Sequence, residues 1–300
     1  MNHFSFELSL LAMIPGLFLC GYVLYKDRIE KEPVSLLALL FGAGAVTYVP
    51  AYFLRELTVG FIDGLFADKM KFSVAGVLTY DSSATELWHN ALCAFLGFSI
   101  IQVCLKWVVL YFGTRRNKNF NYLFDGVVYS VFLSLGFAAA ELVHFAMQNE
   151  GELVIAKLIT CVPCHLFVGI LMGYYYTMGH MRFLVNRIEN RMLADKVVAE
   201  DKIRSSAPWL ICSLAVPALV NGLYEFAAAS RGEFITILFY STVFFVFGIS
   251  FLAVNQLAEK ECASARYLCR VIAKGHPGLT AEQIEAYVSS EEGVYGEAEK

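Results

Sequence analysis

Residues 123–141 read LFDGVVYSVFLSLGFAAAE, and no charged residue interrupts the 15 positions between Asp125 and Glu141. The surrounding apolar run, 121–147, is longer than the about 20 mainly apolar residues that a membrane-spanning helix needs. We therefore predict a transmembrane helix over 121–147. An ionisable group inside a bilayer is costly unless it faces protein or water, so Glu141 is a candidate functional residue.

Six further stretches of the chain are apolar and long enough to cross a membrane. They are 5–25, 34–54, 85–113, 152–179, 207–230 and 233–256. Of the 300 residues 58% are hydrophobic and 17% are charged, where a soluble domain has about 25% charged residues. We expect an all-α, polytopic membrane protein with about seven transmembrane helices. Its surroundings are the lipid bilayer, and the net charge of −4 argues against a nucleic-acid partner.

The positions of the basic residues predict the orientation of the chain. Lys and Arg gather after the first, third and fifth apolar stretches and are sparse in the alternate loops. By the positive-inside rule the N-terminus lies outside and the C-terminus lies in the cytoplasm. No Lys or Arg precedes Lys26, so we expect a retained first helix rather than a cleaved signal peptide.

The same reasoning gives the domain organisation. We predict a membrane domain over 1–256, with an outer loop at 55–84, and a cytoplasmic helical tail over 257–300. The tail is expected to break at Gly275–Gly278 and to resume after Thr280, because Thr280 and Gln283 have the spacing of a capping box.

Polar side chains occur in four consecutive predicted helices. They are Gln102, Lys106, Glu141, His144, His165, Asn221 and Glu225. With a rise of about 1.5 Å per residue, Gln102, His165 and Asn221 reach a common level near the middle of the membrane, and Glu141 lies somewhat nearer the outer face. We predict one polar pocket in the outer half of the bilayer. Cys161, one turn before His165 on the same helix face, is expected to line it.

Three of these residues have a second interpretation. Lys106 is close enough to the cytoplasmic end of its helix to extend its ammonium into the interface. Glu225 is close enough to the outer surface to be solvated. His144 is expected either to pair with Glu141 at the i,i+3 spacing or to lie at the outer interface.

The stretch CVPCH at 161–165 matches the attachment motif of a c-type haem. Because it begins about nine residues inside a predicted helix, we expect no haem. Zinc bound by Cys161, Cys164 and His165 would need a fourth ligand, from His144 or Glu141. Two Glu-x-x-His pairs, 86/89 and 141/144, match part of a di-iron bundle pattern, but the other carboxylates of that pattern are not evident. No cofactor or metal is predicted.

Four segments together resemble the successive motifs of the PrsW family of intramembrane proteases, multi-helix bacterial proteins related to the CAAX prenyl endopeptidases. They are EKEPVSLLALLFGAGAV (30–46), LFDGVVYSVFLSLGFAAAE (123–141), VPCHLFVGILMGYYY (162–176) and VNGLYEF (220–226). The resemblance covers roughly residues 28–230. It implies a multi-pass hydrolase of the bacterial cytoplasmic membrane that cleaves a membrane-embedded protein, often an anti-sigma factor.

The resemblance also implies a mechanism. In it, membrane-embedded glutamates activate a water, and His or Asn groups stabilise the oxyanion; a metalloprotease-like mechanism with a bound metal is the alternative for this family. In this chain Glu141 matches the glutamate of a Phe-x-x-x-Glu motif, and His165 and Asn221 match the later motifs.

The chain departs from the family pattern at two places. Gln102 and Val103 occupy the positions of a Glu-Glu pair, and Asn221 and Glu225 stand where His and Asp are usual. Either Glu141 activates the water, with His165 and Asn221 as donors, or the protein is a catalytically degenerate adaptor or chaperone that binds a transmembrane partner. A transporter is a third interpretation, but the sequence shows neither inverted repeats nor paired broken helices.

Overall fold

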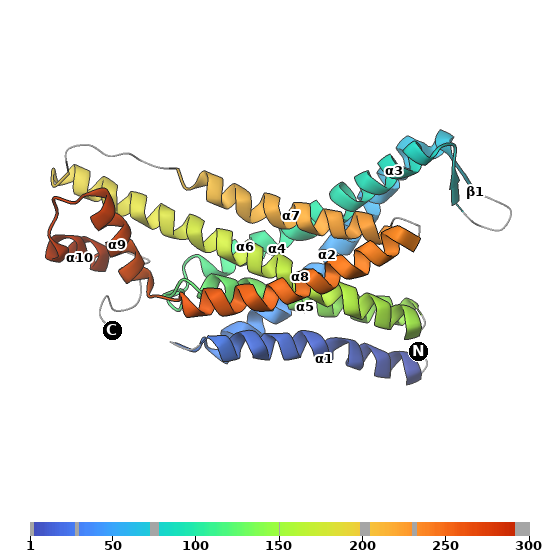
Figure 1. Ribbon diagram of the computed structural model, residues 1–300, viewed down its shortest axis with the longest axis horizontal. Helices are drawn as coiled ribbons and strands as arrows, with labels where there is room; N and C mark the ends of the chain where they lie inside the picture. The colour runs from blue at the N-terminus through green and yellow to red at the C-terminus, as the bar shows by residue number, and fades with distance from the viewer. Residues whose placement is uncertain are drawn as a thin grey trace.

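The computed structural model describes residues 3–27, 30–72, 78–149, 151–198, 205–229 and 233–291. Nearly all of them form helices. The helices of the bundle are α1 (His3–Lys26), α2 (Val34–Phe66), α3 (Ser83–Leu92), η2 (Cys93–Ile100), α4 (Ile101–Thr114), α5 (Asp125–Gln148), α6 (Gly151–Ala194), α7 (Ala207–Ala229) and α8 (Glu233–Glu259). Helices α1, α5, α6, α7 and α8 run roughly along the long axis of the molecule, and α2 and α3 run obliquely to it (Figure 1). The π-helical segment η2 joins α3 and α4 into one continuous rod.

The predicted fold class is confirmed. Within the described residues, six helices are long and apolar enough to cross a membrane, and they coincide with the second to seventh predicted stretches. The first stretch is α1, a helix of 24 residues whose apolar part includes Met13–Lys26. The chain is an all-α, polytopic membrane protein.

The helix that contains the opening sequence, α5, lies at the centre and packs against α1, α2 and α6. Close packing depends on glycines where α5 crosses α2. A Cβ added to Gly136 would lie 2.0 Å from the carbonyl oxygen of Phe41, and one added to Gly44 would lie 2.0 Å from that of Leu133. Helices in membranes approach this closely only where small residues meet.

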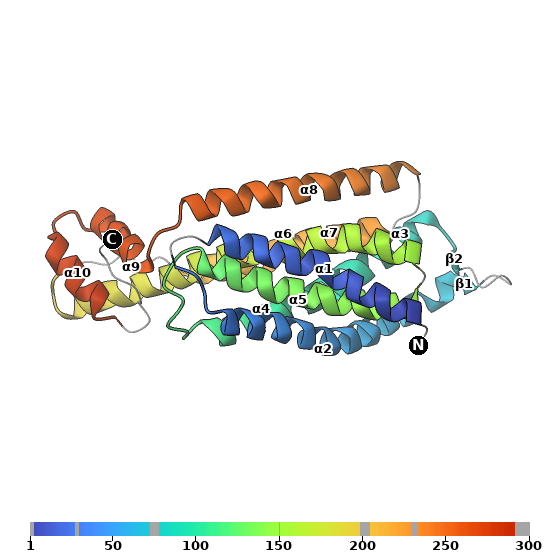
Figure 2. The ribbon, with the colours of Figure 1, turned by 90° about the horizontal axis from the view of Figure 1, so that it is seen from below.

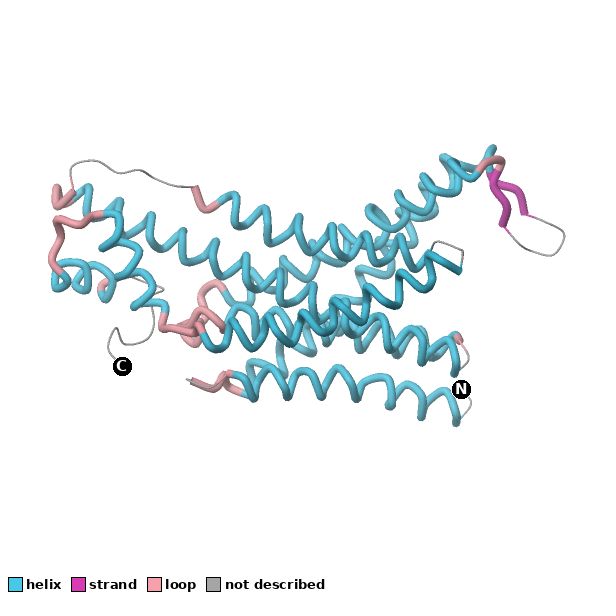
Figure 3. Tube along the Cα trace, viewed as in Figure 1, coloured by secondary structure: helices cyan, strands magenta, loops and turns pink. Residues whose placement is uncertain are grey.

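The second helix is longer than predicted. Helix α2 continues to Phe66 instead of ending near residue 54 and is followed by η1 (Ala67–Lys69). A short antiparallel hairpin of β1 (Met70–Phe72) and β2 (Leu78–Tyr80) then leads to α3, and Figure 3 shows these strands in magenta at one end of the molecule. The predicted outer loop 55–84 is therefore largely helical. The added turns of α2 bury the apolar side chain of Ile62.

The fifth predicted helix also extends further, from residue 179 to Ala194. Its extra turns bury an apolar stripe against α9 (Ser264–Gly275) and α10 (Ala281–Ser289), beyond the end of α8 (Figure 1). The stripe comprises Met181, Leu184, Val185, Ile188 and Met192. The break between the tail helices is confirmed: α9 ends at Gly275, and Thr280 and Gln283 form the expected capping box of α10.

Helix α8 is the most loosely packed helix of the bundle. Figure 2 shows it lying apart from the other helices along its length. Only 17% of its most apolar stretch is buried, compared with 83% for α5. Two apolar cavities flank it: one of about 420 Å³ between α6, α7 and α8, and one of about 520 Å³ between α1, α6 and α8.

Candidate functional site

A network of buried charged groups connects α4, α5 and α6. Glu141 on α5 receives two contacts from α6: its Oε2 lies 3.1 Å from Nε2 of His165, and its Oε1 lies 2.8 Å from Nζ of Lys157. Both Glu141 and His165 are buried, at 9% and 2% exposure. The structure therefore brings together two of the three residues that the sequence motifs single out, and adds a lysine.

Lys106 on α4 completes the network. Its side chain is fully buried, and Nζ lies 3.2 Å from Nδ1 of His165 and over the ring of Phe137, 4.7 Å from its centroid. Its ammonium therefore lies inside the bundle beside His165 and does not extend into the interface. An ammonium group can only donate, so Nδ1 of His165 accepts and Nε2 carries the proton that is donated to Glu141.

The π-helical segment η2 sets the position of Gln102 and Lys106 on the helix that follows it. The segment packs on α7, where the ring of Phe95 fills the space beside Gly222 so closely that a Cβ there would lie 2.3 Å from it. Ser99 donates to the carbonyl of Ala218 on the same helix. Segments of π-helix are rare and occur frequently at functional sites.

Gln102 and Glu225 form a second polar contact between α4 and α7. The two side chains interact, and Oε1 of Gln102 is buried without a partner in the described part of the chain. Glu225 is half-buried. It is not merely a solvated residue at the outer surface.

Asn221 on α7 is deeply buried, at 1% exposure. Its Oδ1 accepts from the thiol of Cys164, the residue before His165, at 3.7 Å. Its Nδ2 is buried and has no hydrogen-bond acceptor among the described residues. Asn221 thus has free donors next to the charged network.

His144 does not pair with Glu141. Its Nδ1 lies 2.6 Å from the hydroxyl of Tyr48 on α2, and its Nε2 contacts Gln148. Although it is one turn from Glu141, its ring faces α2 rather than α6. We assign it to the wall between α2 and α5, outside the charged network.

A small cavity adjoins the network on the side of α2. Its volume is about 20 Å³, and its walls are Tyr48, Ala51, Tyr52, Arg55, Phe98, Gln102, Phe137 and Glu141. A cavity needs about 10–15 Å³ to hold one water. Glu141 and Gln102 therefore share a space that can hold one water, whereas His165 and Asn221 lie outside its walls.

Several residues of this site are not among those predicted from the sequence, above all Lys157. It lies four residues before Cys161 and eight before His165, a spacing that places all three on one helix face. That spacing was the available signal. Arg55 and Tyr48 belong to a helix whose outer end was predicted to be loop, and no local pattern directs them toward Glu141.

The charged network also contains a set of possible metal ligands. Glu141, Cys161 and His165 each offer one atom, all within 4.8 Å of one another, and carboxylate, thiolate and imidazole are the ligands of zinc. Two of the three are already engaged by ammonium groups, Glu141 by Lys157 and His165 by Lys106. Two adjacent positive charges and a protonated Nε2 do not suit a divalent cation. Cys164 contacts Asn221 instead, so the set Cys161, Cys164 and His165 is also unsuitable.

Comparison with known proteins gives consistent matches. The family model described as PrsW family intramembrane metalloprotease matches residues 32–252. Protease PrsW of Bacillus subtilis (strain 168) is 27% identical over 233 residues, which cover 78% of this chain and 86% of that protein. Protease PrsW of Geobacillus kaustophilus (strain HTA426) is 29% identical over 61% of this chain and 70% of its own length. Protease PrsW of Clostridioides difficile (strain 630) is 26% identical over 73% and 78%. No solved structure matches the chain.

Proposed function

This chain belongs to the PrsW family of intramembrane proteases, and on that premise we propose that Glu141 activates the water that cleaves a membrane-embedded protein. One observation carries the proposal: Glu141 lines a cavity with room for a single water, while Lys157 and His165 hold its two oxygens. A carboxylate fixed beside a water is the arrangement that general base catalysis requires.

The proposed reaction divides the work among four residues. Glu141 takes a proton from the water, whose oxygen adds to the peptide carbonyl, and then returns that proton to the leaving amine. The ion pair with Lys157 presents Glu141 as a carboxylate. His165 has both ring nitrogens engaged, by Lys106 and by Glu141, so we assign it a positioning role. Asn221 supplies the amide donors for the oxyanion, because its Nδ2 has no other acceptor among the described residues.

Gln102 occupies the place of an acid in the family motif and cannot act as a base. It lines the same cavity as Glu141, and its Oε1 lacks a partner within the described chain. A water in this cavity can donate one hydrogen to Gln102 and the other to Glu141. We propose that Gln102 orients the water that Glu141 deprotonates.

The substrate is proposed to be a single-pass membrane protein of the anti-sigma-factor type, which approaches from the side of α8. The apolar cavity of about 420 Å³ between α6, α7 and α8 includes Cys164 and Tyr224 in its walls. Cys164 contacts Asn221, and the ring of Tyr224 lies 6.0 Å from Nζ of Lys157. Two wall residues of this cavity thus contact Asn221 and Lys157, and we propose the cavity as the route by which the substrate approaches them.

The proposed location is the bacterial cytoplasmic membrane, with the N-terminus outside and the tail in the cytoplasm. This orientation follows from the basic residues. The hairpin β1–β2 and the helices α9 and α10 lie at opposite ends of the molecule (Figure 1), as an outer loop and a cytoplasmic tail would. Labelling intact cells with a membrane-impermeant thiol reagent tests it: a cysteine at Lys69 should react, and one at Lys274 should not.

The experiment that tests the chemistry is cleavage of such a substrate by full-length protein in proteoliposomes. Glu141→Gln keeps the size and removes the base, and we expect cleavage to fall by roughly 10²- to 10⁴-fold. Glu152→Gln, at an exposed position near the same end of the bundle, is the matched control and should cleave like the wild type. Asn221→Ala should lower kcat by roughly 10²- to 10³-fold.

Unchanged cleavage by Glu141→Gln would show that the proposed chemistry is wrong. If neither the wild type nor the variant cleaves, but both co-purify with a transmembrane partner, the protein is a degenerate adaptor or chaperone on the same scaffold.

A further inference from the structure

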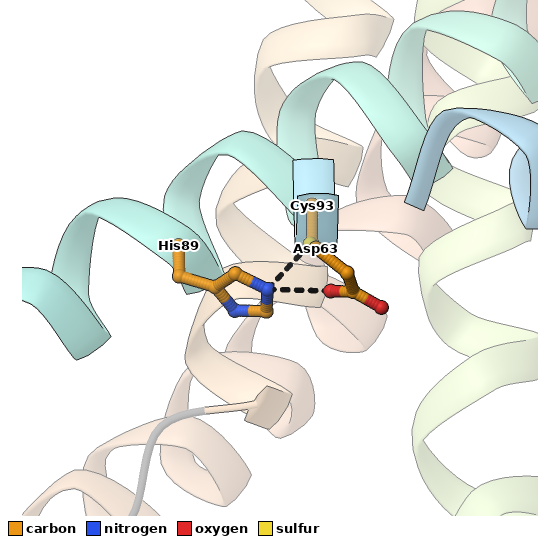
Figure 4. A group of neighbouring side chains, drawn as sticks. All are labelled: Asp63, His89 and Cys93. Carbon is orange, nitrogen blue, oxygen red and sulfur yellow. Dashed lines mark hydrogen bonds and ion pairs between the residues drawn. The ribbon is translucent and has the colours of Figure 1, made fainter. Parts of the chain in front are cut away.

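A second cluster of ligand-type side chains lies where α2 meets α3, near the hairpin. Asp63 comes from α2, and His89 and Cys93 lie one turn apart on the rod formed by α3 and η2. Figure 4 shows all three side chains converging on Nε2 of His89. This atom lies 2.8 Å from Oδ1 of Asp63 and 3.7 Å from Sγ of Cys93.

The imidazole of His89 is held in place from its other side. Its Nδ1 lies 3.1 Å from the hydroxyl of Tyr80 on β2, and the ring of Phe66 packs edge-on at 5.4 Å. The residue is 7% exposed. A ligand histidine almost always has such a partner at its second nitrogen, which fixes the ring and its tautomer.

The separations of the three atoms fit a tetrahedral metal. Zinc bonds of about 2.0–2.3 Å place neighbouring ligand atoms roughly 3.3–3.6 Å apart. The observed 2.8 Å and 3.7 Å differ from these values by less than the reach of a small side-chain rotation. All three ligand atoms lie within 4.8 Å of one another.

The cluster differs from the Glu141 network in its charge. In the part of the chain that the structure describes, the only ion pair of Asp63 is with His89. No ammonium or guanidinium group therefore competes for the position of a cation there. The single proton on Nε2 also faces two acceptors, a carboxylate and a sulfur, and a metal ion would satisfy both.

We propose that Asp63, His89 and Cys93 form a binding site for zinc, with the fourth position open to water or another ligand. Binding releases the thiol proton of Cys93 and moves the remaining proton of His89 to Nδ1, where it is donated to Tyr80. The metal links α2 to the rod that continues through η2 to Gln102 and Lys106. The first effect of the metal is therefore to hold these two helices together. Its ligands lie near the Glu141 network but are not part of it.

Zinc binding by the full-length protein tests the proposal. Protein in nanodiscs is stripped with a chelator, dialysed against buffered zinc and analysed for metal by mass spectrometry. We expect about one zinc per chain for the wild type and an affinity at least roughly tenfold weaker for Cys93→Ser and for Asp63→Asn. Cobalt supplies a second readout, since its thiolate charge-transfer band should be lost in Cys93→Ser.

Cys161→Ser is the matched control, because it removes a buried thiol from the ligand-type cluster around Glu141. It should bind zinc like the wild type. A wild type that takes up no zinc, or a Cys93→Ser variant that binds it equally well, would overturn the proposal. Loss of zinc in Cys161→Ser would place the metal at Glu141 and contradict this site as well as the metal-free mechanism, whereas Glu141→Gln tests the mechanism independently.

Discussion

Two lysines, Lys157 and Lys106, contact Glu141 and His165 and determine the charge of the site. A buried carboxylate or a buried ammonium group without a partner of opposite charge strongly destabilises the folded state. When the two lie in contact, each charge compensates the other. Lys157 is 22% exposed at its side chain and touches Glu141, whereas Lys106 is fully buried and touches His165. The chain thus places a carboxylate, an imidazole and two ammonium groups in contact inside one bundle.

Removing Lys157 should destabilise the protein through Glu141. We expect Lys157→Met to lower the free energy of unfolding by about 3–5 kcal/mol, because the carboxylate loses its charge partner. Lys69→Met, at an exposed position, should have little effect. Thermal unfolding in detergent measures both.

The double variant Lys157→Met with Glu141→Gln separates this pairing from loss of packing. It should recover much of the stability, because no uncompensated charge remains. If the double variant is no more stable than Lys157→Met alone, the ion pair is not the cause.

At the scale of elements, the helices were predictable and their ends were not. The long apolar stretches of the sequence predicted every helix of the bundle, because a helix needs about 20 apolar residues to cross a bilayer. The extra turns of α2 and α6 depend on partners that are distant in sequence. Ile188 is buried only because α9 and α10 fold back onto α6, and no periodicity within 152–194 indicates where those helices lie.

The crossing of α2 and α5 gives a test of element packing. Gly136→Ala should destabilise the protein by about 1–3 kcal/mol or more, since its Cβ would overlap the carbonyl of Phe41. Gly42→Ala is the matched control, because a Cβ there meets nothing within 4 Å. Thermal unfolding of the two variants should differ clearly. Equal stability would mean that the backbones do not approach as closely as described.

At the scale of the whole molecule, the uneven packing of the bundle matters most. Helix α5 is enclosed by its neighbours, while α8 borders two apolar cavities and contributes little buried surface. Loose elements are the ones that move at low cost. The family match runs to residue 252 and so includes most of α8.

Filling the cavity beside α8 should block the proposed approach of the substrate. Thr242 lines the cavity of about 420 Å³, and we expect Thr242→Trp to lower kcat/KM for a membrane-embedded substrate at least tenfold without lowering the unfolding temperature. Phe245→Trp, on an exposed face of the same helix, serves as the control. Equal cleavage by the two variants would exclude this route.

The sequence by itself determined the class of this protein, its membrane helices and the residues of its motifs, because apolar length and short spacings are local properties. Glu141, His165 and Asn221 could be selected on those grounds. Only the tertiary structure decided which polar groups meet: Lys106 and Lys157 converge on the Glu141–His165 pair, and His144 turns away to Tyr48. Those contacts join four helices across long separations in sequence, and they depend on the rotation of each helix about its axis, which the packing of glycines and apolar side chains fixes.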